Sequence, residues 1–428
     1  MKRQLTVLSV LLLIIVLCAL CLSSCTNGIR VSRSGVYLYT AENEEVTITG
    51  YVGVSADVTI PESINGMPVV AIGINAFDST MIKSLTIPDS VVKIDSLAFD
   101  NCYFLERVTL GCGIREISFY AFSDCDNMIY NEYENGNYIG NAENPYMALV
   151  CTLSTDIETL TIHPDTVIVC GTALKNCCNL SELVFPEGMV SICNSALENC
   201  LSLETVYIPK SVELIDRFAF EGCNSIREII VSNDNSHFKS VNGSLFSRDG
   251  SSLIKYAVGQ EVDSYRIPDD TVTIENSAFE NAMHLTDVTF PDSVETIGSF
   301  AFINCENLRS IHFGNALKSI DGQAFGFCTS LTEITIPDSV EELSHSAFSY
   351  CDKLESAVIG SGVIHLECDV FQGCDNLSKV VFRDSSGWQV KTAYSIRSDK
   401  VDLSDPMQNA NFLTDEYCGY YWNKKTNS

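Results

Sequence analysis

The chain has 428 residues, of which 46% are hydrophobic, and its formal net charge at pH 7 is −29. This length suffices for several ordinary domains or one long repeat array, and the hydrophobic content argues against a disordered chain. The excess of 55 acidic over 26 basic residues excludes nucleic acid as a partner, because phosphate binding requires a basic surface.

Residues 1–24 have the composition of an export signal. Lys2 and Arg3 precede the apolar run LTVLSVLLLIIVLCALCL. The sequence LSSC then ends at Cys25 and resembles the lipobox of bacterial lipoproteins. This resemblance implies cleavage before Cys25, lipidation of that cysteine, and membrane contact only through the N-terminal lipid. An uncleaved signal anchor is the alternative, since 18 apolar residues nearly span a bilayer.

Two short segments precede the main body of the chain. Residues 25–34 are expected to form a tether. Residues 35–60 are expected to form an N-terminal β cap, because GVYLYTAENEEVTITGYVG alternates apolar and polar residues as paired strands do. Such a cap covers the apolar end of a repeat array.

Residues 61–383 contain an internal repeat of 23 residues. Three markers recur independently at this interval: a turn residue, an Ala-Phe pair and a cysteine. The turn residues include Pro268, Pro291, Gly314, Pro337 and Gly360. The phenylalanines include Phe279, Phe302, Phe325, Phe348 and Phe371, and the cysteines include Cys305, Cys328, Cys351 and Cys374. Three markers that share one interval predict a repeat architecture.

About eleven units follow the pattern C-x-x-L-x-x-V-x-I-P-x-x-V-x-x-I-x-x-x-A-F-x-x. The part L-x-x-V-x-I alternates like a half-buried strand, proline ends it, V-x-x-I brings the chain back, and Ala-Phe fills the interior. Because so short a unit cannot bury its apolar side alone, the units are expected to stack into a β-rich solenoid. The pattern resembles the BspA-type leucine-rich repeat of bacterial surface proteins over about residues 36–383, and the resemblance implies a leucine-rich repeat array and an adhesive role.

Two insertions interrupt the repeat, at residues 130–160 and 232–266. In the second, Asn242-Gly243 and Asp249-Gly250 are hairpin turn signals. Both insertions are therefore expected to be β-hairpin-like elaborations of the array. Projecting contact loops are the alternative interpretation.

Residues 384–428 lose the repeat and are expected to form a C-terminal cap. They contain both tryptophans, Trp388 and Trp422, and the segment DPMQNANFLTDEY, which predicts a short helix. We expect the aromatic residues to be buried against the last turn. An aromatic platform for sugar binding is the alternative.

Nine cysteines share one repeat position, and equivalent residues of a solenoid stack in columns. They are Cys102, Cys125, Cys177, Cys200, Cys223, Cys305, Cys328, Cys351 and Cys374. Their parallel Cβ vectors oppose the dihedral angle of a disulfide, which predicts buried free thiols and, outside the cell, a low-oxygen environment. Cys170 and Cys193 are expected nearer the surface, as the best candidates for a disulfide.

No catalytic pattern is present in the sequence: H-E-x-x-H, G-x-S-x-G and Walker-type loops are all missing, and no C-x-x-C pair occurs after Cys25. The sequence therefore predicts no enzyme, no catalytic residue, no cofactor and no metal site. A chance pair of carboxylates at the spacing found in glycosidases is the weaker alternative.

The open positions of L-x-x-V-x-I should face outward and provide a ligand-binding face. The residues selected are Arg107, Glu182, Tyr207, Glu228, Ile230, Asp287, Thr289, His312, Glu333 and Thr335. An ordinary solvated strand surface would also explain them.

Together these features predict an exported, monomeric lipoprotein on the extracellular face of the cell. It would be non-catalytic and would bind a protein of a host or bacterial surface. A carbohydrate-binding surface lipoprotein is the alternative, with a glycan as the partner.

Overall fold

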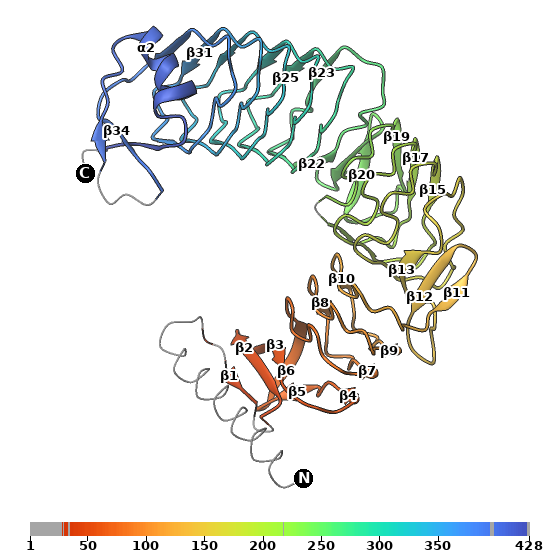
Figure 1. Cartoon of the computed structure of the whole chain (residues 1–428). Helices are drawn as coiled ribbons and strands as arrows, with labels where there is room; N and C mark the ends of the chain where they lie inside the picture. Colours follow the sequence, from red (N-terminus) through yellow and green to blue (C-terminus); the bar gives the residue numbers. More distant parts are fainter. Residues whose placement is uncertain (1–27, 29, 33–34, 217, 394–397, 426–428) are drawn as a thin grey trace. The chain divides into compact units, whose positions relative to one another are not determined.

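The computed structural model describes residues 28, 30–32, 35–216, 218–393 and 398–425. The predicted signal peptide and Cys25 lie outside these residues. The chain divides into two compact units, the first comprising residues 1–151 and 165–173 and the second residues 152–164 and 174–428. Within each unit the backbone winds through stacked turns (Figure 1). In the described part of the chain, no helix is long and apolar enough to cross a membrane.

The first unit consists of short strands in three groups. One sheet has the order β1-β2-β3-β6-β8-β10 with β5 beside β6, a second has the order β4-β7-β9, and β11-β12-β13-β14 form the third group. The strands are β1 (Arg30–Val31), β2 (Tyr37–Glu42), β3 (Glu45–Tyr51), β4 (Asp57–Thr59), β5 (Ser63–Ile64), β6 (Met67–Ile72), β7 (Ser84–Thr86), β8 (Lys93–Ile94), β9 (Arg107–Thr109), β10 (Glu116–Ile117), β11 (Asn131–Tyr133), β12 (Gly136–Ile139), β13 (Ala148–Thr152) and β14 (Ile168–Val169).

The second unit repeats the same plan over more turns. Its long sheet has the order β20-β21-β22-β24-β26-β28-β30-β32-β36-β34-β35, and β16 pairs with β18. Three shorter sheets are β15-β17-β19, β23-β25-β27 and β29-β31-β33. The elements are β15 (Glu182–Val184), β16 (Ser191–Ile192), β17 (Thr205–Ile208), β18 (Leu214–Ile215), β19 (Glu228–Val231), β20 (Phe238–Val241), β21 (Ser244–Ser247), β22 (Ser252–Lys255), β23 (Ser264–Arg266), β24 (Thr273–Ile274), β25 (Asp287–Thr289), β26 (Thr296–Ile297), β27 (Ser310–His312), β28 (Ser319–Ile320), β29 (Glu333–Thr335), β30 (Glu342–Leu343), β31 (Ser356–Ile359), β32 (His365–Leu366), β33 (Lys379–Phe382), β34 (Trp388–Lys391), β35 (Asp399–Lys400), α2 (Pro406–Asn411), the π-helix η1 (Phe412–Glu416) and β36 (Tyr421–Lys424).

Each repeat makes one turn with two short strands, as the unit around Pro337 shows. Strand β29 precedes this proline, whose carbonyl accepts the N–H of Val340 at 3.3 Å, and β30 follows. Successive turns pair in parallel with a shift of one repeat. At the next turn Gly360 replaces the proline, because a Cβ there would lie 2.1 Å from the carbonyl oxygen of Pro337. The predicted solenoid is confirmed, with about 15 turns in the described residues. It has more turns than pattern-bearing units because strands of the cap and the insertions, such as β3, β13 and β22, pair with the repeat strands.

Stacked aromatic rings fill the interior and form what we call the phenylalanine ladder. In the second unit it runs through Tyr256, Phe279, Phe302, Phe325, Phe348 and Phe371, with ring centroids 4.4–5.7 Å apart. In the first unit Tyr51, Phe77, Phe99 and Phe122 stack at 5.1–5.3 Å. Contact between these rings holds the turns that carry them together, and buried Leu174 and Leu197 take the equivalent position in two other turns.

The nine repeat cysteines form the cysteine column. All nine are buried free thiols. Eight of them donate S–H to a backbone carbonyl of the preceding turn, with Sγ to O distances of 3.1–3.3 Å. Cysteine suits this position because it is small, apolar and still a weak donor. By contrast, Cys170 and Cys193 are buried, so their expected position near the surface is wrong.

The second insertion contains the expected hairpin. Strands β20 and β21 are antiparallel, and Asn242 and Gly243 between them both have positive φ, as a tight hairpin turn requires. Asn235 fixes the start of the insertion to the preceding turn. Its amide nitrogen donates to the carbonyls of Pro209 and Val212, both at 2.9 Å, and its side-chain oxygen accepts the N–H groups of residues 237 and 238. In the first insertion β11 and β12 likewise form an antiparallel hairpin.

Residues after β33 cover the last turn of the second unit. The predicted short helix is confirmed as α2 and η1, and α2 begins after Asp405, whose side chain accepts the N–H of Met407 at 2.9 Å. Trp388 and Trp422 are buried, and their indole N–H groups donate to backbone carbonyls within the same segment. The prediction that the tryptophans are buried is therefore confirmed, and neither is exposed as a sugar platform.

Candidate functional site

The ten residues predicted to form a ligand-binding face all lie on strands. Arg107 is on β9, Glu182 on β15, Tyr207 on β17, Glu228 and Ile230 on β19, Asp287 and Thr289 on β25, His312 on β27, and Glu333 and Thr335 on β29. These strands belong to four separate three-stranded sheets, of which β4-β7-β9 lies in the first unit. The predicted face is therefore carried by four groups of paired strands, although β27 and β29 of neighbouring groups are in contact, and ligand binding by any of their surfaces stays a prediction.

The sheet β15-β17-β19 carries the most apolar of these surfaces. Val184, Tyr207 and Ile230 lie opposite one another on adjacent strands, and we call them the apolar row. Val184 is 55% exposed and Tyr207 36% exposed. Glu182 and Glu228 lie two residues earlier on the outer strands and are exposed. An exposed apolar centre with an acidic border is the composition expected of a protein-binding surface.

The other two sheets of the second unit carry charged residues, and β29-β31-β33 also has the half-buried Val358 and Val381 beside Thr335. On β23-β25-β27, His312 Nε2 lies 3.1 Å from Asp287 Oδ2, and both side chains contact solvent. On β29-β31-β33, Glu333 and Lys379 lie on the outer strands with Ser356 between them. Each sheet therefore presents a different arrangement of charges.

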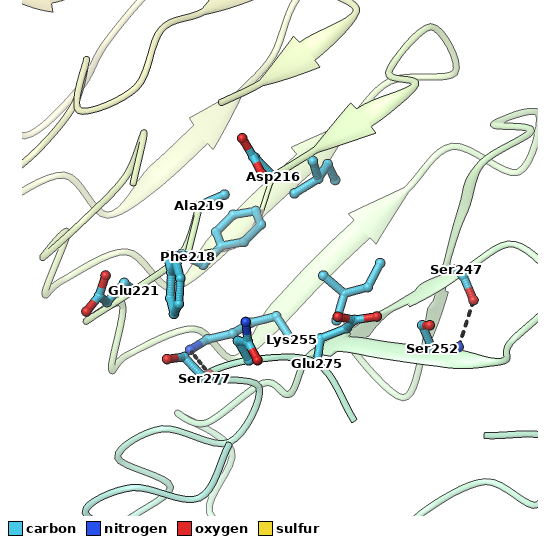
Figure 2. A pocket seen from close by; sticks show the side chains of 13 residues that line it. Asp216, Phe218, Ala219, Glu221, Ser247, Ser252, Lys255, Glu275 and Ser277 are labelled. Carbon is cyan, nitrogen blue, oxygen red and sulfur yellow. Dashed lines mark hydrogen bonds between the residues drawn. The ribbon is translucent and has the colours of Figure 1, made fainter. Parts of the chain in front are cut away.

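A pocket that was not predicted from the sequence lies at the second insertion. It has a volume of about 280 Å³. Phe218 and Glu221 line it from the turn before the insertion, Lys255 from the insertion itself, and Glu275 and Ser277 from the turn that follows (Figure 2). A second pocket of about 400 Å³ shares Phe218, Glu221 and Ser277 with it.

Lys255 reaches this pocket because it occupies the alanine position of an Ala-Phe pair. Lys255-Tyr256 stands 23 residues before Ala278-Phe279. Tyr256 donates its N–H to the Ala278 carbonyl at 2.9 Å, and its ring stacks on Phe279 at 4.6 Å, as a phenylalanine of the ladder does. The lysine therefore lies where other turns have a methyl group. Alignment of this dipeptide with the repeat is the signal that would have located the pocket.

The charges in the pocket are only partly compensated. Lys255 is 3% exposed, and its ammonium donates one hydrogen bond, to the Ser277 carbonyl at 3.2 Å. Among the described residues, no carboxylate oxygen lies within 4.0 Å of it. Burial lowers the pKa of Lys255, although the carboxylates of Glu280 and Glu221 oppose this effect. Burial, followed by the charges of Glu280 and Glu198, raises the pKa of Glu221.

Glu280, which lies near Lys255, has a polar atom without a partner. Its Oε2 is buried and has no hydrogen-bond partner. Unpaired polar groups of this kind are unfavourable in a protein interior unless a ligand or water completes them. The part of the chain that the structure describes contains no group of three or more His, Cys, Asp or Glu residues that could hold a metal ion.

Comparison with known families identifies the repeat. The BspA-type leucine-rich repeat model matches residues 56–143, 151–264 and 256–378 and covers six copies of the repeat. The chain therefore belongs to the BspA-type leucine-rich repeat family. The predicted family and fold class are both confirmed.

Several solved structures are similar to the chain. A leucine-rich cell surface protein of Faecalibacterium prausnitzii is 25% identical, with a TM-score of 0.47 and coverage of 85% of this chain and 97% of that one. The pneumococcal vaccine antigen PcpA is 20% identical, with a TM-score of 0.48 and coverage of 84% and 89%. A leucine-rich repeat protein of Bacteroides ovatus is 22% identical, with a TM-score of 0.36 and coverage of 83% and 93%. No curated protein matches the chain.

Proposed function

We propose that this chain is a non-catalytic, lipid-anchored protein of the cell surface whose solenoid binds a protein partner. Three features support the proposal: membership of the BspA-type family, the predicted export signal of residues 1–24 followed by Cys25, and the stacked repeats within each unit. Rigid arrays of stacked repeats provide extended surfaces for macromolecular partners. The protein partner would belong to a host or to a neighbouring bacterium.

The apolar row on β15-β17-β19 is the observation on which the protein-binding function mainly rests. Its three side chains come from adjacent strands and face away from the core, and Tyr207 is central. Tyrosine is enriched at interface centres because one side chain supplies apolar area and a polar group. The acidic border formed by Glu182 and Glu228 favours a partner with basic residues around an apolar centre.

Glycan binding is the second candidate function, supported by a different exposed aromatic pair. The rings of Phe327 and Tyr350 stack at 4.8 Å with an interplanar angle of 11°. Both residues are exposed and have positive φ, at a repeat position where neighbouring turns have Asn304 and Gly373. A bulky residue in this conformation costs about 1–3 kcal/mol, and the repeat also places Phe218 and Phe300 in it, so the support comes from the exposure and stacking of the two rings. Exposed aromatic rings can pack on the apolar faces of sugars.

Two substitutions separate these functions. Tyr207→Ala removes the centre of the apolar row, and Tyr350→Asn converts the aromatic pair to the residue type found at Asn304. We expect Tyr207→Ala to lower the capture of surface proteins from host-matrix and bacterial extracts at least tenfold, while Tyr350→Asn leaves capture unchanged. A glycan array run with the same proteins tests the second candidate. Saturable glycan binding lost in Tyr350→Asn, together with no protein capture by the unmodified chain, would refute the protein-binding proposal.

The lipid anchor requires a separate test. Cells that express the chain are labelled with a radioactive fatty acid, and the protein is isolated. Labelling should occur in the unmodified chain and be lost in Cys25→Ala, whereas Cys18→Ala should have no effect. Incorporation that persists in Cys25→Ala would show that this cysteine is not the acylated residue.

A further inference from the structure

Lys255 has no evident role in building the solenoid. Other turns of the second unit have alanine at the equivalent position, for example Ala278, Ala301 and Ala324. Replacing a buried methyl group by an ammonium is unfavourable, because a charge must be removed from water. Since the repeat itself needs only alanine here, the lysine calls for a functional explanation.

The ammonium of Lys255 has the geometry of a ligand-binding group. It lines the pocket, and one hydrogen bond to the Ser277 carbonyl leaves two of its three N–H groups without a protein acceptor among the described residues. A buried ammonium that lacks a counter-ion at contact distance is stabilised by an anionic group placed in the pocket.

The rest of the pocket limits what that anionic group can belong to. Glu221 and Glu275 also line it, and Glu280 lines the adjoining pocket that shares Glu221. Figure 2 shows Lys255 between Glu221 and Glu275 in projection. These carboxylates repel a dianion such as phosphate and attract a positive group. A ligand that carries one carboxylate and one ammonium matches both requirements.

The size and apolar lining of the pocket complete the description. Its volume of about 280 Å³ lies just below the usual range of roughly 300–1,000 Å³ for small-molecule sites. Phe218, Phe220 and Ile254 provide an apolar part of the wall. This combination favours a small zwitterion with an apolar side chain.

We propose that this pocket binds a free apolar α-amino acid. Lys255 would bind its carboxylate, Glu221 and the neighbouring carboxylates its ammonium, and Phe218 with Ile254 its side chain. The site is separate from the apolar row and does not depend on the macromolecular function proposed above.

Calorimetric titration of the whole chain with matched probes tests the proposal. L-leucine is compared with 4-methylpentanoate, which lacks the ammonium, and with 3-methylbutylamine, which lacks the carboxylate; L-valine, L-phenylalanine and inorganic phosphate complete the set. We expect saturable binding of at least one of the three amino acids. For leucine, each half-molecule should bind at least tenfold more weakly, and phosphate should not bind.

Three variants connect binding to the pocket. Lys255→Met removes the charge and the hydrogen bond to Ser277 but keeps an unbranched side chain, and Lys255→Ala restores the residue that other turns contain, so both should fold. Each should weaken amino-acid binding at least tenfold, whereas the exposed control Lys353→Met should bind as the unmodified chain does. The proposal is overturned if no amino acid binds, if 3-methylbutylamine alone binds as tightly as leucine, or if Lys255→Met binds normally.

Discussion

The Lys255→Met substitution is expected to stabilise the second unit at neutral pH. Methionine keeps an unbranched side chain but removes the buried ammonium, whose one hydrogen bond is to the Ser277 carbonyl at 3.2 Å. Loss of that bond costs about 1.5–3 kcal/mol of stability. Removal of the buried charge, which has no counter-ion in contact, gains several kcal/mol because the charge no longer has to leave water when the chain folds. The expected net gain in the free energy of unfolding is about 1–3 kcal/mol.

This gain should depend on pH in a defined direction. Burial lowers the folded-state pKa of Lys255 below its ordinary value of 10.5. Between these two pKa values the unfolded chain binds a proton that the folded chain does not, so the stability of the wild type rises with pH there. The methionine variant lacks this rise. Its advantage should therefore be greatest below the folded-state pKa and disappear above about 10.5.

Other titrating groups face Lys255, and the comparison must account for them. Glu280, Glu221, Cys223 and Cys305 all lie close enough to affect its charge. Burial raises the pKa of Glu221, so its titration reduces stability as pH rises above the ordinary pKa of a glutamate. These groups are present in both the wild type and Lys255→Met, so the difference in the free energy of unfolding between the two proteins reports mainly the contribution of Lys255.

Denaturant unfolding followed by circular dichroism between pH 7 and pH 10.5 measures this difference. In thermal unfolding, 1 kcal/mol corresponds to about 2–4 °C for a unit of this size. Lys353→Met is the control, because the same chemical change at an exposed site should leave stability almost unaltered. A methionine variant less stable than the wild type at pH 7, or a stability difference that does not change up to pH 10.5, would refute the reasoning.

Four further substitutions test the packing. Phe325→Leu removes ring contacts at 5.0 and 5.2 Å, which contribute about 0.5–1.5 kcal/mol each. Phe371→Leu removes a ring contact at 5.7 Å. In urea unfolding, Phe325→Leu should therefore lower the free energy of unfolding more than Phe371→Leu does. Cys328→Ala loses one S–H to carbonyl bond and should cost about 1 kcal/mol in the same assay. Asn235→Ala removes four hydrogen bonds from a buried position and should cost about 3 kcal/mol or more, with faster hydrogen exchange in residues 235–247.

Each of these predictions has an outcome that contradicts it. Equal losses in the two phenylalanine variants would show that ring stacking adds nothing beyond apolar burial. Disulfides between Cys200 and Cys223, found by non-reducing mass spectrometry of the native chain, would contradict the column of free thiols. If hydrogen exchange in residues 235–247 is the same in Asn235→Ala as in the wild type, the Asn235 side chain does not hold the second insertion in place.

Much of the fold could be predicted because each repeat has the same residue types at the same positions. Pro337 ends a strand, as the equivalent prolines of other repeats do. Phe348 stacks on the ring of Phe325, and Cys351 belongs to the cysteine column, because stacking of the turns places equivalent residues next to one another. Asn242-Gly243 predicted its hairpin through backbone conformations that few other residues adopt. These features depend on residues close in sequence or separated by one fixed interval.

The division of the predicted binding face could not be read from the same pattern. The open positions at Tyr207, Asp287 and Glu333 are equivalent or adjacent in the repeat, but they lie on three different sheets. The sequence indicates which residues face outward, whereas only the tertiary structure shows where the pairing of strands stops.

The pocket depends still more on tertiary structure. Glu221 and Lys255 line one cavity although Lys255 belongs to the insertion that follows the turn of Glu221, and their distance in sequence is no multiple of the repeat. The sequence by itself determined the solenoid, its caps and its outward positions, since these follow from periodic burial. Alignment with the repeat indicates that Lys255 takes the place of a buried alanine, but only the folded chain showed that a cavity lies beside it, because the cavity arises from packing between turns.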